Sequence, residues 1–180
     1  LIKTNKTAAI YVTHDLSLVA QIADNILVLK DGRQIEYGST SQIINNPKED
    51  YTKALIAAAH IMPEELSSSY FTSSKTAPLI EVKDITAGYG KRQEMTAVEN
   101  VNLTIESGET VGIIGESGSG KTTLGRIISG LMAPRSGVVM LNGKPLHGHL
   151  ANRSRDELRD IQFAFQMADV ALNPRQKIEK

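Results

Sequence analysis

Residues 115–122 read GESGSGKT and constrain this chain more than any other stretch, because they match G-x-x-x-x-G-K-[ST] without a mismatch. A short run of apolar and β-branched residues, 110–114, precedes them and is typical of a buried parallel strand. Leu124, Ile127 and Leu131 follow at helical spacing. The order of strand, glycine loop and helix predicts a site for the phosphates of a nucleotide.

The loop supplies what a phosphate chain needs. Its glycines let successive backbone N–H groups point into one concavity, which the positive end of the following helix also faces. Lys121 would reach the β- and γ-phosphates, and the Thr122 hydroxyl would ligate Mg²⁺. The alternative is a Gly/Ser turn before a helix, but a chance match has a probability on the order of one per cent. The predicted nucleotide-binding residues of the loop are Gly115, Glu116, Ser117, Gly118, Ser119, Gly120, Lys121, Thr122 and Thr123.

Length and composition limit the remaining possibilities. The 180 residues allow one domain or parts of two. The 20 basic and 20 acidic side chains balance, which argues against a nucleic-acid partner. The chain has no cysteine, and no apolar run approaches the roughly 18 to 20 residues that span a bilayer. Because it does not begin with Met and carries no signal peptide, we expect an internal piece of a longer protein.

The first 60 residues alternate between predicted strands and helices. Residues 8–12 are expected to form a strand, and a helix with Asp15 or Thr13 as its N-cap follows. His14 stands at the carboxyl end of this strand, where open α/β sheets bind ligands, although an ordinary strand-end histidine is the more frequent case. Further predicted elements are strands 26–29 and 33–37 around an Asp31-Gly32 turn, a helix with the capping box Ser39 to Gln42, and a helix from Tyr51 to about His60.

A Ser-, Thr- and Pro-rich stretch separates this part from the rest and is expected to be a linker. Strands are predicted after it at 79–85, ended by residues 86–90, and at 97–105, 138–141 and 161–165, with a short helix starting at Ser154 or Asp156. His147 and His149 lie one residue apart, but no further metal-ligating side chain lies near them in the sequence. We therefore do not expect a metal site there.

The order of these motifs resembles the nucleotide-binding domains of ABC transporters, above all the fused two-domain ATPase subunits of dipeptide and oligopeptide importers. In that family a phosphate loop comes first, a glutamine at a strand end follows, and a histidine comes near the end. Here the order is THDLSLVAQIADNILVLKDGR, then ESGSGKTT, then FAFQ with LNPR. The resemblance implies the α/β fold of a P-loop NTPase of ABC ATPase type in two incomplete domains: residues 1–60 from the end of a first, linker 61–78, and residues 79–180 from the start of a second.

The resemblance also assigns roles to residues outside the phosphate loop. Tyr89 would stack on adenine, although it could equally be a core residue at a strand edge. Gln166 would coordinate Mg²⁺ together with Thr122, and would also hold the attacking water. His14 would contact the γ-phosphate and that water, so that His14 and Gln166 are the implied catalytic residues. Because His14 and Lys121 fall in different domains, they are expected to serve different nucleotides.

The chain departs from the family pattern in two places. It contains no LSGGQ-like signature and no apolar run that ends in Asp-Glu. The signature, the acidic Mg²⁺ ligand and the general base would therefore lie outside these residues, and the same absence argues against a circularly permuted single domain. We expect the 180 residues alone to be inactive as an ATPase.

The function implied by the resemblance is hydrolysis of ATP with Mg²⁺ to power import of a solute, which we expect to be peptides. The whole protein would lie peripherally on the cytoplasmic face of the inner membrane. Its partners would be integral membrane permease subunits, a second ATPase domain in the same chain or a homologous subunit, and indirectly an extracytoplasmic solute-binding protein. One alternative is a soluble ABC-type ATPase of translation or DNA repair. The neutral charge disfavours it, and so does the YTKALIAAA segment, which resembles the C-terminal helix of the peptide-importer branch. Another is a small P-loop kinase or GTPase, but no acidic Mg²⁺ ligand follows the loop in a strand context.

Overall fold

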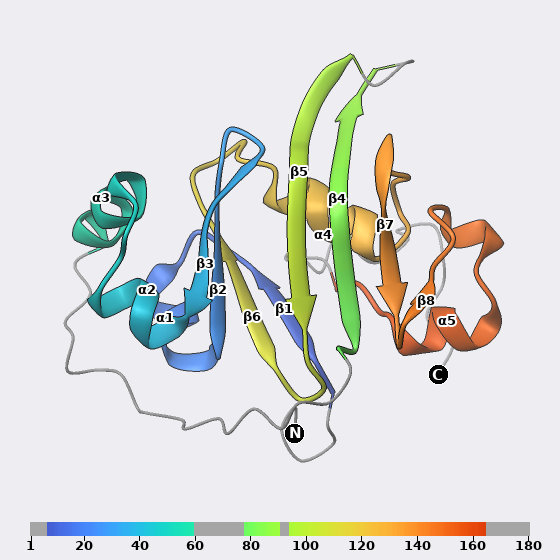
Figure 1. Cartoon of the computed structure of the whole chain (residues 1–180), viewed down its shortest axis with the longest axis horizontal. Helices are drawn as coiled ribbons and strands as arrows, with labels where there is room; N and C mark the ends of the chain where they lie inside the picture. Colours follow the sequence, from blue (N-terminus) through green and yellow to red (C-terminus); the bar gives the residue numbers. More distant parts are fainter. Residues whose placement is uncertain (1–6, 60–77, 91–93, 165–180) are drawn as a thin grey trace, which may run out of the picture.

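The computed structural model describes residues 7–59, 78–90 and 94–164. Among these residues, eight strands form one sheet in the order β1-β6-β2-β3-β5-β4-β7-β8 (Figure 1). The strands are β1 (Ala9–Val12), β2 (Asn25–Lys30), β3 (Arg33–Ser39), β4 (Ile80–Tyr89), β5 (Met95–Ile105), β6 (Thr110–Ile114), β7 (Ser136–Leu141) and β8 (Lys144–Pro145). The helices are α1 (Leu16–Ile22), α2 (Thr40–Asn45), α3 (Asp50–Ala58), α4 (Lys121–Ile128) and α5 (Arg155–Asp160), with a 3-10 helix η2 at Leu150–Asn152.

Strand β6, which leads into the phosphate loop, lies between two strands from the first 60 residues. It pairs in parallel with β1 and with β2, so that Ile113 lies opposite Val12 on one side and Leu27 on the other. Further along the sheet, β4 is antiparallel to both of its neighbours, β5 and β7. The predicted α/β fold of a P-loop NTPase is confirmed. The division at the linker stays a prediction, although strands from both sides of the linker share one sheet.

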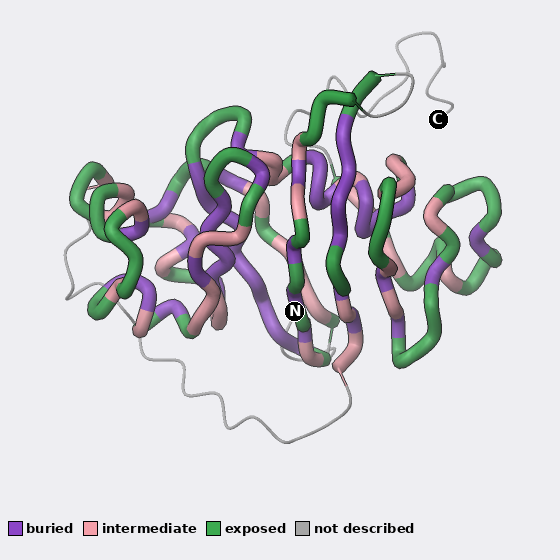
Figure 2. Tube along the Cα trace, turned by 45° about the horizontal axis from the view of Figure 1, so that its top comes forward, coloured by how far each residue is buried: buried purple, intermediate pink, exposed green. Residues whose placement is uncertain are grey.

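The central strands are buried on both faces. In β2, Leu27 and Leu29 face a core that includes Leu124 of α4 and the inner residues of β4 and β5. Ile26 and Val28 face the opposite way, into a core formed with α1 and α2. Figure 2 shows the buried residues concentrated in the sheet and the exposed ones in its marginal loops and helices. A continuous apolar sequence in a parallel strand is thus explained by burial from both sides.

Two predicted strand boundaries are wrong. Strand β4 continues through residues 86–89, which the sequence indicated as a break, and its pairing with β5 shifts register at three places between Val82 and Gly88. These irregularities let the strand carry Thr-Ala-Gly without ending, as β-bulges do. The strand predicted at 161–165 is absent from its described part, because Ile161 is the C-cap of α5 and residues 162–164 are not in a strand.

Most of the predicted caps and turns are confirmed. Asp15 caps α1 by accepting the Leu18 N–H at 3.0 Å, and Ser154 forms a complete capping box with Glu157. Ser39 caps α2, but the predicted box is incomplete because the Gln42 side chain donates to Glu36 instead. Local residues therefore determine where these helices start. In α2, one of the two hydrogen bonds of the capping box is replaced by the contact between Gln42 and Glu36.

The start of α3 is fixed by a buried carboxylate. Glu36 of β3 is only 8% exposed. Its Oε1 accepts hydrogen bonds from Gln42 Nε2 at 2.9 Å and from the Lys48 N–H at 3.0 Å, and its Oε2 accepts from the Glu49 N–H at 3.2 Å. Because Glu49 is the N-cap of α3, these bonds determine where the helix begins relative to the sheet.

Low pH is expected to weaken the hydrogen bonds that the Glu36 carboxylate accepts at the start of α3. Burial raises the pKa of Glu36, but the hydrogen bonds that the carboxylate accepts outweigh burial and hold the pKa below its ordinary value of 4.5. A carboxyl group whose pKa is lowered by folding stabilises the folded state at pH values above its ordinary pKa. That stability is lost as the pH falls through the lowered pKa of the folded state. We expect Glu36→Gln to reduce the free energy of unfolding by about 1–3 kcal/mol at neutral pH, measured by urea titration.

The difference between Glu36→Gln and the wild type should disappear well below pH 4.5, where the carboxyl is protonated in both folded and unfolded chains. Glu99→Gln is the control, because the Glu99 side chain is 41% exposed and pairs with Arg33 near the surface, where an ion pair contributes little. A destabilisation by Glu36→Gln that stays constant with pH would contradict the role given to this carboxylate.

Candidate functional site

The phosphate loop joins the carboxyl end of β6 to the first turn of α4. Gly120 is the N-cap of α4 with φ of +97°, and no side chain accepts a hydrogen bond at this cap. The first N–H groups of a helix have no partner within the helix, and they carry its positive end. The N-terminus of α4 is therefore open to an anionic ligand.

Glycine is required at two positions where the loop passes close to the sheet. Gly115 has φ of +144°, and a Cβ there would overlap the Leu29 carbonyl oxygen of β2. A Cβ on Gly120 would lie 2.5 Å from the Ala97 carbonyl oxygen of β5. Both obstacles are strand backbone, which cannot move aside as a flexible side chain can, so the loop needs these glycines to adopt its shape.

Lys121 lies across the loop and holds its two ends together. Its Nζ donates hydrogen bonds to the Gly115 carbonyl at 2.8 Å, the Glu116 carbonyl at 2.7 Å and Ser119 Oγ at 3.3 Å. Burial lowers the pKa of Lys121, because an ammonium is less well solvated there than in water. The ammonium is thus positioned by backbone carbonyls beside the open helix end.

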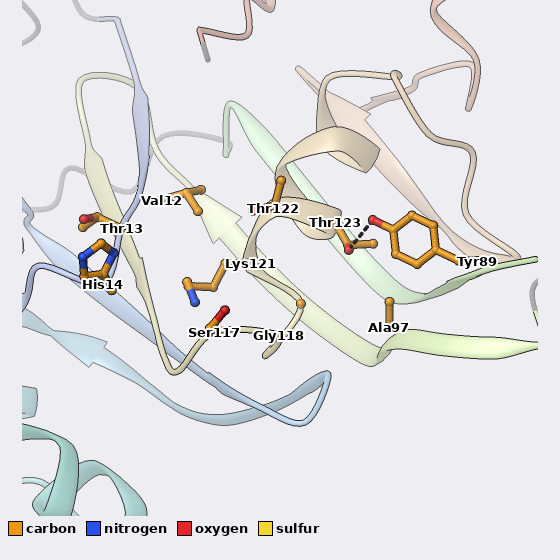
Figure 3. Close-up of a pocket in the computed structure, with 11 residues that line it drawn as sticks. Val12, Thr13, His14, Tyr89, Ala97, Ser117, Gly118, Lys121, Thr122 and Thr123 are labelled. Atoms are coloured by element: carbon orange, nitrogen blue, oxygen red, sulfur yellow. Dashed lines mark hydrogen bonds between the residues drawn. The ribbon is translucent and has the colours of Figure 1, made fainter. Parts of the chain in front are cut away.

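A cavity of about 440 Å³ lies over this loop and extends along the sheet in both directions. Figure 3 shows Lys121 between His14 on one side and Tyr89 on the other. The residues that line the cavity come from β1 and the segment after it, from β4 and β5, and from the loop and α4: Val12, Thr13, His14, Tyr89, Ala97, Ser117, Gly118, Gly120, Lys121, Thr122 and Thr123.

His14 and Lys121 border the same cavity, although the motif order predicts that they serve different nucleotides. The cause is the sheet order. Strand β1, which ends just before His14, pairs directly with β6, which ends just before the loop that holds Lys121. Because parallel strands end at the same edge of a sheet, the two residues border one cavity although they lie far apart in the sequence.

Tyr89 is held at the far end of the cavity. Its hydroxyl makes a hydrogen bond of 3.0 Å with Thr123 Oγ1 of α4 (Figure 3). The residue is 44% exposed, so the alternative that Tyr89 belongs to the core is wrong. The ring is thus tethered and half-exposed at the cavity, where it could serve as an aromatic platform for a planar group.

The remaining predicted site residues differ in position. Gly115, Glu116 and Ser119 do not line the cavity, but all three accept hydrogen bonds from Lys121. Gln166 lies outside the described residues. Sequence reasoning missed Val12, Thr13 and Ala97 as lining residues. The position of Thr13 beside His14 at a strand end was a usable signal, whereas Ala97 carried none.

The described residues could bind Mg²⁺ only together with a phosphate group that supplies further ligands. Among them, no group of three or more His, Cys, Asp or Glu side chains could hold a metal ion by itself. Thr122 lines the cavity at the start of α4 and can offer one hydroxyl ligand. Mg²⁺ commonly takes its other ligands from phosphate and water. In the segment of His147 and His149, the Nδ1 of His147 accepts a hydrogen bond from the His149 N–H at 3.1 Å.

The arrangement can bind a chain of phosphates that ends in a planar base. The helix end and the Lys121 ammonium supply positive charge, and Tyr89 supplies an aromatic face at the other end of the cavity. His14, whose ring nitrogens can take part in hydrogen bonds, borders the cavity on the β1 side. No helix of the described residues has the length and apolar character needed to cross a membrane.

Comparisons with known proteins agree with the motif order. Residues 98–180 match the model of the ABC transporter family. The glutathione import ATP-binding protein GsiA of Salmonella paratyphi A is 32% identical over 198 aligned positions, which cover 94% of this chain and 32% of that protein. GsiA of Escherichia coli O6:H1 is 32% identical over 205 positions, which cover 98% of this chain and 33% of that protein. The chain thus spans about a third of the length of these relatives.

Among solved structures, a nucleotide-free ATP-binding cassette from an ABC transporter is similar to this chain. The TM-score is 0.37, and the identity is 28% over 40% of this chain and 27% of that one. Another is cbiO1 from Clostridium perfringens, part of the transporter complex cbiONQ, with a TM-score of 0.37 and 27% identity over 46% of this chain and 30% of that one. The sequence matches show that the chain is similar to glutathione import ATP-binding proteins and that residues 98–180 resemble the ABC transporter family.

Proposed function

We propose that this chain binds ATP with Mg²⁺ at the loop between β6 and α4, as part of an ATPase that powers import of a solute. One observation carries the proposal: Lys121, the N-terminus of α4, His14 and Tyr89 all border one cavity. Positive charge at one end and an exposed aromatic ring at the other match the two ends of a nucleoside triphosphate. The homology to import ATP-binding proteins supports the transport role.

The residues divide the work of binding. The amides at the start of α4 and the Lys121 ammonium would stabilise the β- and γ-phosphates, and the Thr122 hydroxyl would be a ligand of the metal. Tyr89 would stack on the adenine. His14 would contact the γ-phosphate and orient the water that attacks it. A bound Mg²⁺ supplies charge neutralisation of the phosphates.

In the whole protein, attack of water on the γ-phosphorus would break its bond to the β-γ bridging oxygen and release ADP and phosphate. Gln166 remains a proposed ligand of the metal and the water. The proposed setting is the cytoplasmic face of the membrane, with permease subunits, a second ATPase domain and indirectly a solute-binding protein as partners. The relatives are glutathione importers by name, and glutathione is itself a tripeptide, which supports a small peptide as the solute.

Lys121→Ala is expected to weaken binding of magnesium-ATP to the purified chain by about 10- to 150-fold, which corresponds to the loss of a hydrogen bond to a charged group. Isothermal titration calorimetry measures this affinity, and a thermal melt of each variant establishes that it is folded. Lys144→Ala is the matched control, because Lys144 is an exposed lysine of β8 that does not line the cavity.

The control should bind magnesium-ATP as the wild type does. If the folded wild type binds no ATP, or if both lysine variants bind it equally well, the proposed function is wrong. Turnover is not the readout, because binding alone tests the site that the described residues form.

A further inference from the structure

Helix α3 contacts the phosphate loop through one side chain, although the two are far apart in the sequence. The hydroxyl oxygen of Tyr51, in the first turn of α3, accepts a hydrogen bond of 3.2 Å from the backbone N–H of Glu116. The helix lies against β3 at one end of the molecule, beside the central sheet (Figure 1). Tyr51 thus connects an element outside the cavity to the second residue of the loop.

The bond from Tyr51 and a bond from Lys121 act on the same peptide group. The peptide between Gly115 and Glu116 has its carbonyl oxygen 2.8 Å from Lys121 Nζ and its N–H 3.2 Å from the Tyr51 hydroxyl. A trans peptide is planar, and its C=O and N–H point in opposite directions. The Lys121 and Tyr51 side chains therefore form hydrogen bonds to it from opposite sides. Hydrogen bonds in such a chain polarise one another, so that each strengthens its neighbour.

Tyr51 is itself held in place from two directions. Its ring faces the ammonium of Lys30, with Nζ 4.8 Å from the ring centre. Lys30 ends β2, the strand that pairs with β6. The start of α3, one residue before Tyr51, is fixed by the Glu36 carboxylate through the Glu49 N–H. The hydroxyl is therefore placed by the sheet and by the helix together.

We propose that Tyr51 is a positioning residue of the nucleotide site, which holds the Gly115–Glu116 peptide so that Lys121 stays aligned toward the phosphates. Without the hydroxyl, the peptide can rotate and the Lys121 ammonium loses a fixed acceptor. The phosphate loop is then less ordered before the nucleotide binds. The entropy lost in ordering it on binding lowers the affinity for the nucleotide. The effect on affinity rests on the proposed function, whereas the effect on the peptide does not.

Tyr51→Phe tests the proposal, because it removes the hydroxyl and keeps the ring over Lys30. In the nucleotide-free full chain, exchange of the Glu116 amide hydrogen, measured by nuclear magnetic resonance, should become about three- to tenfold faster. The dissociation constant of magnesium-ATP should rise by a similar factor.

Tyr37→Phe is the matched control. It removes a tyrosine hydroxyl that donates to the Thr104 carbonyl at 3.1 Å and lies 3.5 Å from Glu109 Oε1, away from the loop. It should change stability about as much as Tyr51→Phe does, but neither the Glu116 exchange rate nor the affinity for magnesium-ATP. A merely structural Tyr51 would behave like this control.

The results separate the two proposals. Unchanged exchange of the Glu116 amide in Tyr51→Phe would overturn the positioning role, whatever the affinity. Suppose that the wild type binds ATP and that Tyr51→Phe exchanges the Glu116 amide faster but binds ATP with unchanged affinity. This result would also overturn the positioning role, and it would leave the proposed function standing. If the wild type binds no ATP, the proposed function fails, and the exchange rates alone decide whether Tyr51 holds the peptide.

Discussion

Gly120→Ala is expected to lower the free energy of unfolding by about 3–5 kcal/mol, combining backbone strain with a steric overlap. The residue has φ of +97°, a conformation that alanine adopts at a cost. Its new Cβ would also lie 2.5 Å from the Ala97 carbonyl oxygen and 2.7 Å from Val98 Cγ1. Both atoms belong to β5, whose pairing with β4 prevents it from withdrawing.

Gly118→Ala separates the strain from the overlap. Gly118 lies in the same loop with φ of +84°, but a Cβ there would meet nothing within 4 Å. This variant should lose only the strain component of about 1–2 kcal/mol. Urea titration of both variants measures the difference. Equal losses for the two would contradict the close approach of the loop to β5.

The parts of the fold that could be predicted are those that neighbouring residues determine. The phosphate loop, the start of α4 and the caps of α1 and α5 each depend on residues within a few positions of one another. The sequence pattern of β6 was also sufficient, because a strand buried on both faces is apolar throughout.

The parts that could not be predicted depend on contacts between distant segments. Nothing in the sequence near His14 indicates that β1 pairs with β6, so the shared cavity was not foreseen. The bond between Tyr51 and Glu116 joins residues 65 positions apart, and no local pattern marks either of them as a partner. Strand β4 ran past its predicted end because β5 pairs with it as far as Tyr89, and β7 pairs with it as far as Thr86.

Strand β6 is where these distant contacts converge, because it joins the segments before and after residues 61–78. Ile113 is fully buried and lies opposite both Val12 of β1 and Leu27 of β2. Its carbonyl also accepts the Thr13 N–H at 3.3 Å. If both parts of the chain fold as one unit, a cavity at Ile113 must destabilise them together.

We therefore expect Ile113→Ala to lower the free energy of unfolding by about 2–5 kcal/mol, as removal of a buried aliphatic side chain does. Native-state hydrogen exchange should report the same loss at the Leu27 amide of β2 and at the Val98 amide of β5, because one cooperative unit opens as a whole. Leu131→Ala is the control, since Leu131 is 45% exposed and should cost within about 0.5 kcal/mol. If Val98 loses protection while Leu27 keeps it, the two parts of the chain fold separately, and His14 and Lys121 would not share a stable cavity.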